Sequence, residues 1–224
     1  AVFLGTGLNC ARSAESREIP EISDASQLFV DLQRVEQLEN IKHDFHAAKK
    51  HPANPVCRKE KPWEELYRTV GSVIFDSDEK MFKVWYLGQG RSTGANQAGR
   101  QTYRHNLCYA ISHDGIRWIR PELGLHEYAG SKKNNIIWMG YGAHNFAPFL
   151  DENPDCPVDE RIKALAGSSR RGLWAFASAD GKKFRKLREK AVIDRGWFDS
   201  LNLAFWDSIS GLYREFHRVF REGR

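Results

Sequence analysis

The stretches Ser112-His-Asp-Gly-Ile-Arg-Trp118 and Ser178-Ala-Asp-Gly-Lys-Lys-Phe184 share one pattern, S-x-D-G-x-x-(W/F). Each follows an apolar run, residues 107–111 in the first case and 173–177 in the second. Asp-Gly between two strand-like runs is a strong hairpin signal, because glycine adopts positive φ and aspartate hydrogen-bonds its own turn. The sequence therefore predicts the same β-hairpin twice.

A second repeat interleaves with the first. Its unit is an apolar strand that ends in Asp, a polar turn and a strand of alternating character. Its three copies are 72–76 with 82–86, 146–151 with 161–165, and 203–207 with 212–216. The aspartates that end the first strands, Asp76, Asp151 and Asp207, are interpreted as turn formers. Together the two repeats predict a four-stranded antiparallel meander that occurs twice, followed by half of a third.

Four-stranded units that recur every few tens of residues are typical of a β-propeller. We therefore expect an all-β chain, and a β-sandwich, the alternative, gives no reason for one turn to recur in register. A propeller closes with about four to eight blades. Residues 27–224 are thus predicted to be the N-terminal two and a half blades of an incomplete ring.

The composition of the 224 residues excludes several classes of protein. A hydrophobic share of 41% with 12% aromatic residues is too high for a disordered chain. No run approaches about 18 consecutive apolar residues, so no membrane span is expected. The net charge of +5 permits an anionic partner without requiring one. The basic segment 182–188 alternates with period two, which favours a half-buried outer strand over a nucleic-acid surface.

Residues 1–14 are mostly small or apolar and resemble the end of a secretory signal peptide, although Arg12 departs from the usual cleavage pattern. Residues 1–26 are therefore predicted to be a signal-peptide remnant and linker, and the protein to be secreted or periplasmic. The four cysteines include no C-x-x-C pair, which argues against a structural zinc site. The sequence is compatible with one or two disulfides among the cysteines and equally with buried free thiols.

A propeller binds ligands at one end of its axis, where loops enter the innermost strand of each blade. Polar side chains gather at the corresponding places in this sequence. They are Glu64 and Arg68 near the first such strand, His144 and Asn145 before the second, Asp199 and Asn202 near the third, and Arg218 after the next strand. Carboxylates, amides, imidazole and guanidinium groups suit the hydroxyls of a sugar. We therefore expect an oligo- or polysaccharide partner, no nucleic acid and no metal ligands.

Hydrolysis of a glycosidic bond requires two carboxyl groups that face each other across it. The candidates are Glu64 and Asp199, with Asp31 as a third, because residues 28–31 form a strand that is expected to belong to the closing blade. Arg68, His144, Asn145, Asn202 and Arg218 would orient the sugar hydroxyls. The alternative is that these acids are turn and cap residues, which are common before strands.

Several motifs carry a family resemblance. They are Leu28-Phe-Val-Asp31, Pro62-Trp-Glu64, Phe82-Lys-Val-Trp-Tyr86, residues 108–118, Pro121-Glu-Leu-Gly124 and Phe198-Asp-Ser-Leu-Asn202. From about Gln27 onward the chain resembles exported bacterial proteins related to glycoside hydrolase families 32, 43 and 68. The resemblance implies a five-bladed propeller and a glycosidase-like site with three acidic residues. By the same analogy a calcium ion on the axis is conceivable, and no other cofactor is implied.

The chain departs from that family's pattern at the acids. The sucrose-acting enzymes carry R-D-P in the second blade, where this chain has Phe146-Ala-Pro148. Asp199-Ser-Leu could stand in for the acid of the third blade. The leading expectation is an enzyme that hydrolyses a glycosidic bond in an oligo- or polysaccharide. The departures leave a non-catalytic sugar-binding propeller as the alternative function, with a scaffold for protein partners as a third class. A sialidase ranks lower, because the S-x-D-G-x-x-W turn is one residue short of that family's Asp-box.

Overall fold

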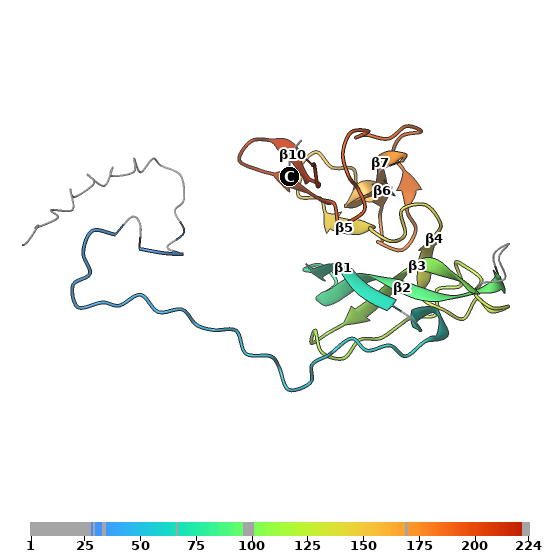
Figure 1. Cartoon of the computed structure of the whole chain (residues 1–224). Coiled ribbons are helices and arrows are strands. Elements are labelled where there is room, and N and C mark those ends of the chain that lie inside the picture. Colours follow the sequence, from blue (N-terminus) through green and yellow to red (C-terminus); the bar gives the residue numbers. More distant parts are fainter. Residues whose placement is uncertain are drawn as a thin grey trace, which may run out of the picture. The chain divides into compact units, whose positions relative to one another are not determined.

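The computed structural model of this chain describes residues 28, 30–32, 35–65, 67–95, 101–168 and 170–220, with residues 67–70, 92–95 and 101–103 described by their backbone. It divides into two units, residues 1–49 and 50–224, and the helices and strands lie in the second (Figure 1). The predicted signal-peptide remnant and linker, residues 1–26, fall outside the described residues. Within the described ranges, no helix is long and apolar enough to cross a membrane.

The described residues of the second unit form two four-stranded antiparallel sheets and a two-stranded hairpin. The strands are β1 (Tyr67–Asp76), β2 (Met81–Ala95), β3 (Gln101–Ser112), β4 (Ile136–Met139), β5 (Ala147–Leu150), β6 (Ile162–Ser168), β7 (Gly172–Ser178), β8 (Arg185–Lys186), β9 (Leu203–Asp207) and β10 (Leu212–Phe216). Single 3-10 turns, η1 (Pro62–Glu64) and η2 (Val158–Glu160), precede β1 and β6. The prediction of an all-β chain with four-stranded antiparallel sheets is confirmed.

The three predicted hairpins are present as β1–β2, β5–β6 and β9–β10. In each, the aspartate at the end of the first strand accepts backbone N–H groups of the turn. Asp76 bonds to Asp78 and Glu79, Asp151 to Asn153, and Asp207 to Ile209 and Ser210. The interpretation of these aspartates as turn formers is confirmed.

The fourth strands differ from the expectation. After the Asp114-Gly115 turn the chain makes a single bridge between Ile111 and Ile119, and β4 begins later, at Ile136. Pro121 follows that bridge closely, and proline has no N–H to continue a ladder. In the second sheet, β8 comprises two exposed residues, so the prediction of a half-buried strand over 182–188 was too long.

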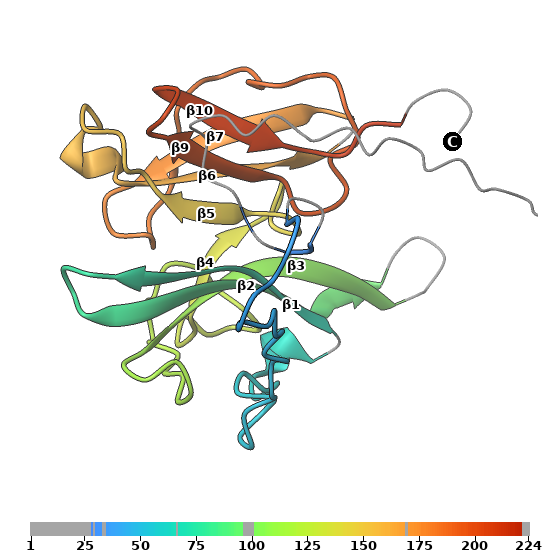
Figure 2. The same cartoon turned by 90° about the vertical axis from the view of Figure 1, so that its left-hand side faces the viewer.

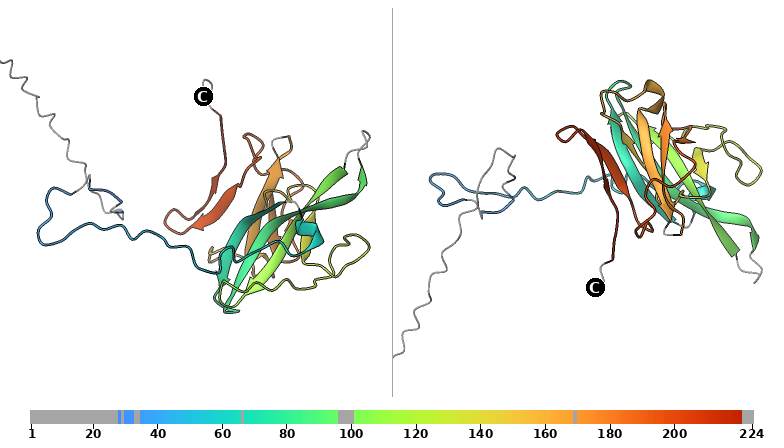
Figure 3. Two further views of the ribbon diagram at one scale, coloured as in Figure 1. Left: turned by 60° about the horizontal axis from the view of Figure 1, so that its bottom comes forward. Right: turned by 90° about the horizontal axis from the view of Figure 1, so that it is seen from above.

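The sheets are stacked as layers, with β5–β8 between β1–β4 and the β9–β10 hairpin (Figures 2 and 3). Aromatic side chains fill the first interface, with Trp85 and Tyr109 packed against Phe146 and Phe176. Trp85 also donates its indole N–H to the carbonyl of Gly181, at 2.7 Å. The first strands of successive sheets touch, β1 against β5 and β5 against β9. No sheet closes on itself within the described residues.

Candidate functional site

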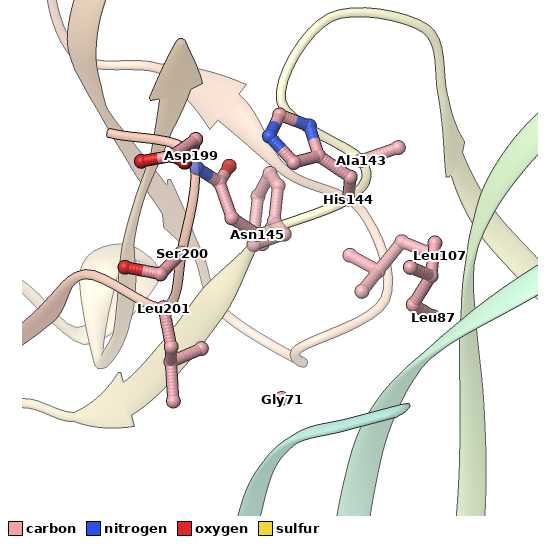
Figure 4. Close-up of a pocket in the computed structure, with 10 residues that line it drawn as sticks. Gly71, Leu87, Leu107, Ala143, His144, Asn145, Asp199, Ser200 and Leu201 are labelled. Atoms are coloured by element: carbon pink, nitrogen blue, oxygen red, sulfur yellow. The ribbon is translucent and has the colours of Figure 1, made fainter. Parts of the chain in front are cut away.

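A pocket of 280 Å³ lies where the first strands of the three sheets approach one another. Gly71 of β1, Leu87 of β2 and Leu107 of β3 form one side of it, and residues 143–146 before β5 and 199–201 before β9 form the other (Figure 4). Its volume is just below the roughly 300–1,000 Å³ that small-molecule sites occupy. The pocket therefore brings together segments that the sequence analysis had placed at one end of the fold.

Asp199 supplies the negative charge of this pocket. Its carboxylate accepts a hydrogen bond from the guanidinium of Arg218, and both side chains are about half exposed. The bond from Arg218 lowers the pKa of Asp199, so the carboxylate is ionised near neutral pH. Asp199 and Arg218, predicted separately as a catalytic and a substrate-binding residue, are thus brought together, and the hydrogen bond from Arg218 holds the carboxylate in place.

His144 projects into the same pocket beside Asp199 (Figure 4). Its ring centroid lies 5.8 Å from that of His105 in β3. Burial lowers the pKa of both histidines, and for His144 the neighbouring His105 lowers it further while Asp199 opposes the shift. Both imidazoles are therefore neutral near pH 7, and a neutral imidazole offers one donor and one acceptor.

A second hollow, of 400 Å³, is lined by Arg104, His105, Met139 and Gly140. His105 lines this hollow and His144 lines the first, so the histidine pair links them. Nε2 of His105 also lies 3.0 Å from the side-chain amide of Gln89 on β2. The combined site offers the Asp199 carboxylate, two neutral imidazoles, a side-chain amide and the Ser200 hydroxyl, with Arg104 in the lining of the second hollow.

The two predicted asparagines hold the walls of the site in place. Asn145 donates to the carbonyl of Phe198 at 2.5 Å and accepts from the N–H of Gly167 at 3.1 Å. Asn202 is fully buried and donates to the carbonyl of Ser200 at 2.9 Å. Asn202 therefore holds the 199–201 segment directly, and Asn145 holds Phe198, the residue before it. Asn145 lines the pocket, but its side-chain oxygen and nitrogen already take part in these protein hydrogen bonds.

Glu64 lies at the end of η1 and is 0% exposed. Its Oε1 accepts the phenol O–H of Tyr86 at 2.5 Å and Nε of Arg120 at 2.9 Å, and its Oε2 accepts the N–H of Glu60. It is absent from the described lining of the Asp199 pocket. Both carboxylate oxygens of this predicted acid are thus hydrogen-bonded within the protein, and the bond from Tyr86 of β2 connects η1 to the first sheet.

Two other predicted residues are not brought to the pocket. Asp31 belongs to the N-terminal unit, residues 1–49, and lies in a bend, so the described residues of 28–31 do not form the predicted strand. Arg68 lies in β1, and its side chain is outside the described part of the structure. The two residues stay predictions.

His105, Ser200, Leu87 and Leu107 were not predicted as site residues, although they line the hollows. Leu87 and Leu107 lie opposite each other on β2 and β3, and Gln89 lies opposite His105 two residues further along. Side chains two positions apart on a β-strand lie on the same face. Once Leu87 of β2 is paired with Leu107 of β3, this rule places Gln89 beside His105.

Calcium takes six to eight oxygen ligands. Among the described residues no group of three or more His, Cys, Asp and Glu side chains is arranged to hold a metal ion. The pocket residues do not fit the axial calcium ion that the resemblance made conceivable, because Asp199 is the carboxylate there and is already bonded to Arg218. Cys108 and Cys156 are free thiols, and Cys10 lies outside the described residues.

Comparisons with protein-family models, curated proteins and solved structures find no match to this chain.

Proposed function

We propose that this chain is a carbohydrate-binding protein with a glycosidase-like site, and that the sugar occupies the pocket between His144 and Asp199. The observation that carries the proposal is the composition of that pocket. A carboxylate, an imidazole and a hydroxyl stand on one side, and Leu87 and Leu107 stand on the other. A sugar presents both hydroxyls and apolar C–H faces, and small-molecule sites pair a few placed polar groups with apolar walls in this way.

The layering supports the five-bladed propeller that the resemblance implies. In this proposal the sheets β1–β4 and β5–β8 and the hairpin β9–β10 are consecutive blades, and β1, β5 and β9 are their innermost strands. The contacts of β1 with β5 and of β5 with β9 agree with such an order. The pocket beside these strands would then be the axial site of the propeller.

Binding without hydrolysis is the function that the pocket geometry favours. Glycoside hydrolysis needs two carboxyl groups about 5 to 10 Å apart across the bond. Asp199 is the carboxylate among the described lining residues, while Glu64 is buried against Arg120 and Tyr86. Ala147, which replaces the family's acid, begins β5.

Glycoside hydrolysis of an oligo- or polysaccharide is the second candidate. The lowered pKa of Asp199 favours it, since an ionised carboxylate can serve as the base or the nucleophile. In this version the acid comes from a residue outside the described lining of the pocket. Secretion or a periplasmic location, proposed from residues 1–14, would bring either function into contact with extracellular glycans.

The substitution Asp199→Asn tests the proposal. It removes the charge that would accept a sugar hydroxyl, and a hydrogen bond to a charged group contributes about 1.5–3 kcal/mol. Affinity for glycans that the native chain selects from an array should fall roughly 10- to 100-fold, and any turnover should cease. Asp155→Asn removes an exposed carboxylate outside the pocket and should change neither. Native affinity in the Asp199→Asn variant would contradict the proposal.

A further inference from the structure

The second hollow lies where β3 extends beyond the end of β4. The last residue of β4, Met139, lies opposite Asn106 of β3. Arg104 and His105 come before Asn106 in β3, so they lie beyond the last pair of this ladder, and both are exposed. Successive side chains of a strand point to opposite faces. The hollow at this end of β3 therefore receives one side chain from each face of the sheet.

The polar side chains of the hollow donate hydrogen bonds. The guanidinium of Arg104 is charged and carries N–H donors only. The side-chain amide nitrogen of Gln89 can only donate, so Nε2 of His105, at 3.0 Å, accepts from it. The neutral imidazole of His105 then carries its proton on Nδ1. Among the described lining residues there is no Asp or Glu. The hollow thus suits an occupant that accepts hydrogen bonds and carries negative charge.

Arg104 differs from other arginines of this part of the fold, because it forms no ion pair with a carboxylate of the described residues. Those arginines are paired, Arg91 with Glu65 at 3.1 Å, Arg120 with Glu64 at 2.9 Å, and Arg218 with Asp199. The nearby carboxylates are therefore already bound to other cations. The charge of Arg104 is left for a ligand.

A buried amide beside the hollow also lacks a partner. Asn106 is 0% exposed, and neither its side-chain oxygen nor its side-chain nitrogen has a hydrogen-bond partner among the described residues. The alternation of β3 places Asn106 on the same face as Arg104, and it lies opposite Met139, which lines the hollow. The large majority of buried polar side-chain atoms in proteins are hydrogen-bonded. The unpaired amide therefore favours a polar occupant beside it over an apolar one.

We propose, on the basis of the sugar binding proposed above, that the second hollow binds an anionic substituent of the glycan, a uronate carboxylate or a sulfate ester. The rings of His105 and His144 are 5.8 Å apart, so one ligand can span both hollows. Arg218 neutralises Asp199, which limits its repulsion of an anionic ligand. Carboxylate and sulfate oxygens accept hydrogen bonds and match the planar fork of the Arg104 guanidinium. The preferred ligand is thus an acidic glycan.

An array that holds each glycan in a neutral, a uronate-containing and a sulfated form supplies the probes. We expect the native chain to bind an acidic form roughly tenfold more tightly than the neutral form of the same backbone. A preference for the uronates identifies the bound group as a carboxylate, and a preference for the sulfated forms identifies it as a sulfate ester. The preference should narrow as the salt concentration rises, because salt screens the charge of an exposed residue such as Arg104.

Two matched variants locate the anion. Arg104→Gln removes the charge from the hollow, and Arg188→Gln removes the same charge from an exposed residue outside the lining of both hollows. Arg104→Gln should lower the ratio of acidic to neutral affinity roughly tenfold, while Arg188→Gln should leave the ratio unchanged. Equal ratios in the two variants would show that net charge, and not the hollow, attracts the anion, and would overturn the proposal.

Two further results separate this proposal from sugar binding itself. If the native chain binds the acidic and neutral forms equally well, the anionic subsite is overturned and the sugar-binding pocket stands. If the native chain binds none of the glycans on the array, the proposed function is overturned and the anionic subsite with it.

Discussion

At the scale of single residues, the fold repeats one ion pair, buried in the first two hairpins and more exposed in the third. Each aspartate that ends a first strand accepts a hydrogen bond from a cation on the following strand. The pairs are Asp76–Lys83, Asp151–Lys163 and Asp207–Arg214. Burial alone would raise the pKa of Asp76, but the bonds from Lys83 and from the turn outweigh it and hold the pKa well below its usual range. Two of these aspartates also bind a side chain from the following sheet or hairpin. Arg161, just before β6, contacts Asp76, and Tyr213 of β10 donates to Asp151.

Exposure of the cation decides how much each pair stabilises the fold. The side chain of Lys83 is 1% exposed and that of Arg214 is 51% exposed. Lys83→Met leaves a buried carboxylate with a weaker partner and should lower the free energy of unfolding by about 3 kcal/mol. Arg214→Met, the matched change in a solvent-screened pair, should cost less than about 1 kcal/mol. Urea unfolding measures both, and equal losses would show that burial is not the deciding factor.

The aspartates could be predicted from the sequence as turn formers, but their cations could not. The cation follows its aspartate by 7, 12 and 7 residues in the three hairpins, because the second turn is longer. Strand pairing restores the regularity, since each cation lies opposite the residue two positions before its aspartate. A constant spacing between aspartate and cation would have revealed the pair in the sequence. The spacing is not constant, because the length of the turn between the two strands varies.

At the scale of elements, the two Ser-x-Asp-Gly turns are the same structure. In each, the serine Oγ accepts the N–H groups of Asp and Gly, and the aspartate accepts the next two N–H groups. These bonds lower the pKa of Asp114 to about 2, led by the N–H of Arg117. This element was predictable because its contacts are local. The position of β4 was not, because a long loop separates it from the turn.

The two turns differ in what they pack against, and this difference predicts the effect of one substitution. Gly115 and Gly181 both have φ near +70°, so alanine strains either by about 1–2 kcal/mol. A Cβ at Gly181 would lie 2.6 Å from Trp85 Cζ2, whereas at Gly115 its nearest neighbour is Phe82 at 3.7 Å. Gly181→Ala should therefore cost about 1–3 kcal/mol more than Gly115→Ala in thermal or urea unfolding. Equal costs would mean that the second turn does not anchor the interface at Trp85.

At the scale of the whole unit, the pocket forms where segments from three sheets meet. Its predicted members His144 and Asp199 come from loops before β5 and β9, and the rule that such loops share one end of the stack was sufficient to find them. The same rule selected Glu64, whose partner Arg120 lies 56 residues away in sequence. No local pattern reveals that partner, so the sequence could not distinguish a buried structural acid from a pocket acid.

A nitrogen-15 NMR titration of the histidine side chains tests the central claim, that the His144–Asp199 pocket binds sugar. With a panel of neutral oligosaccharides, we expect saturable shifts of the His144 and His105 imidazole signals and of the Ser200 amide. The Trp63 indole signal, which reports on the Glu64 and Tyr86 network through Asn135, should stay unchanged. Saturable binding that leaves the His144 and His105 signals unmoved, or no binding across the panel, would contradict the account.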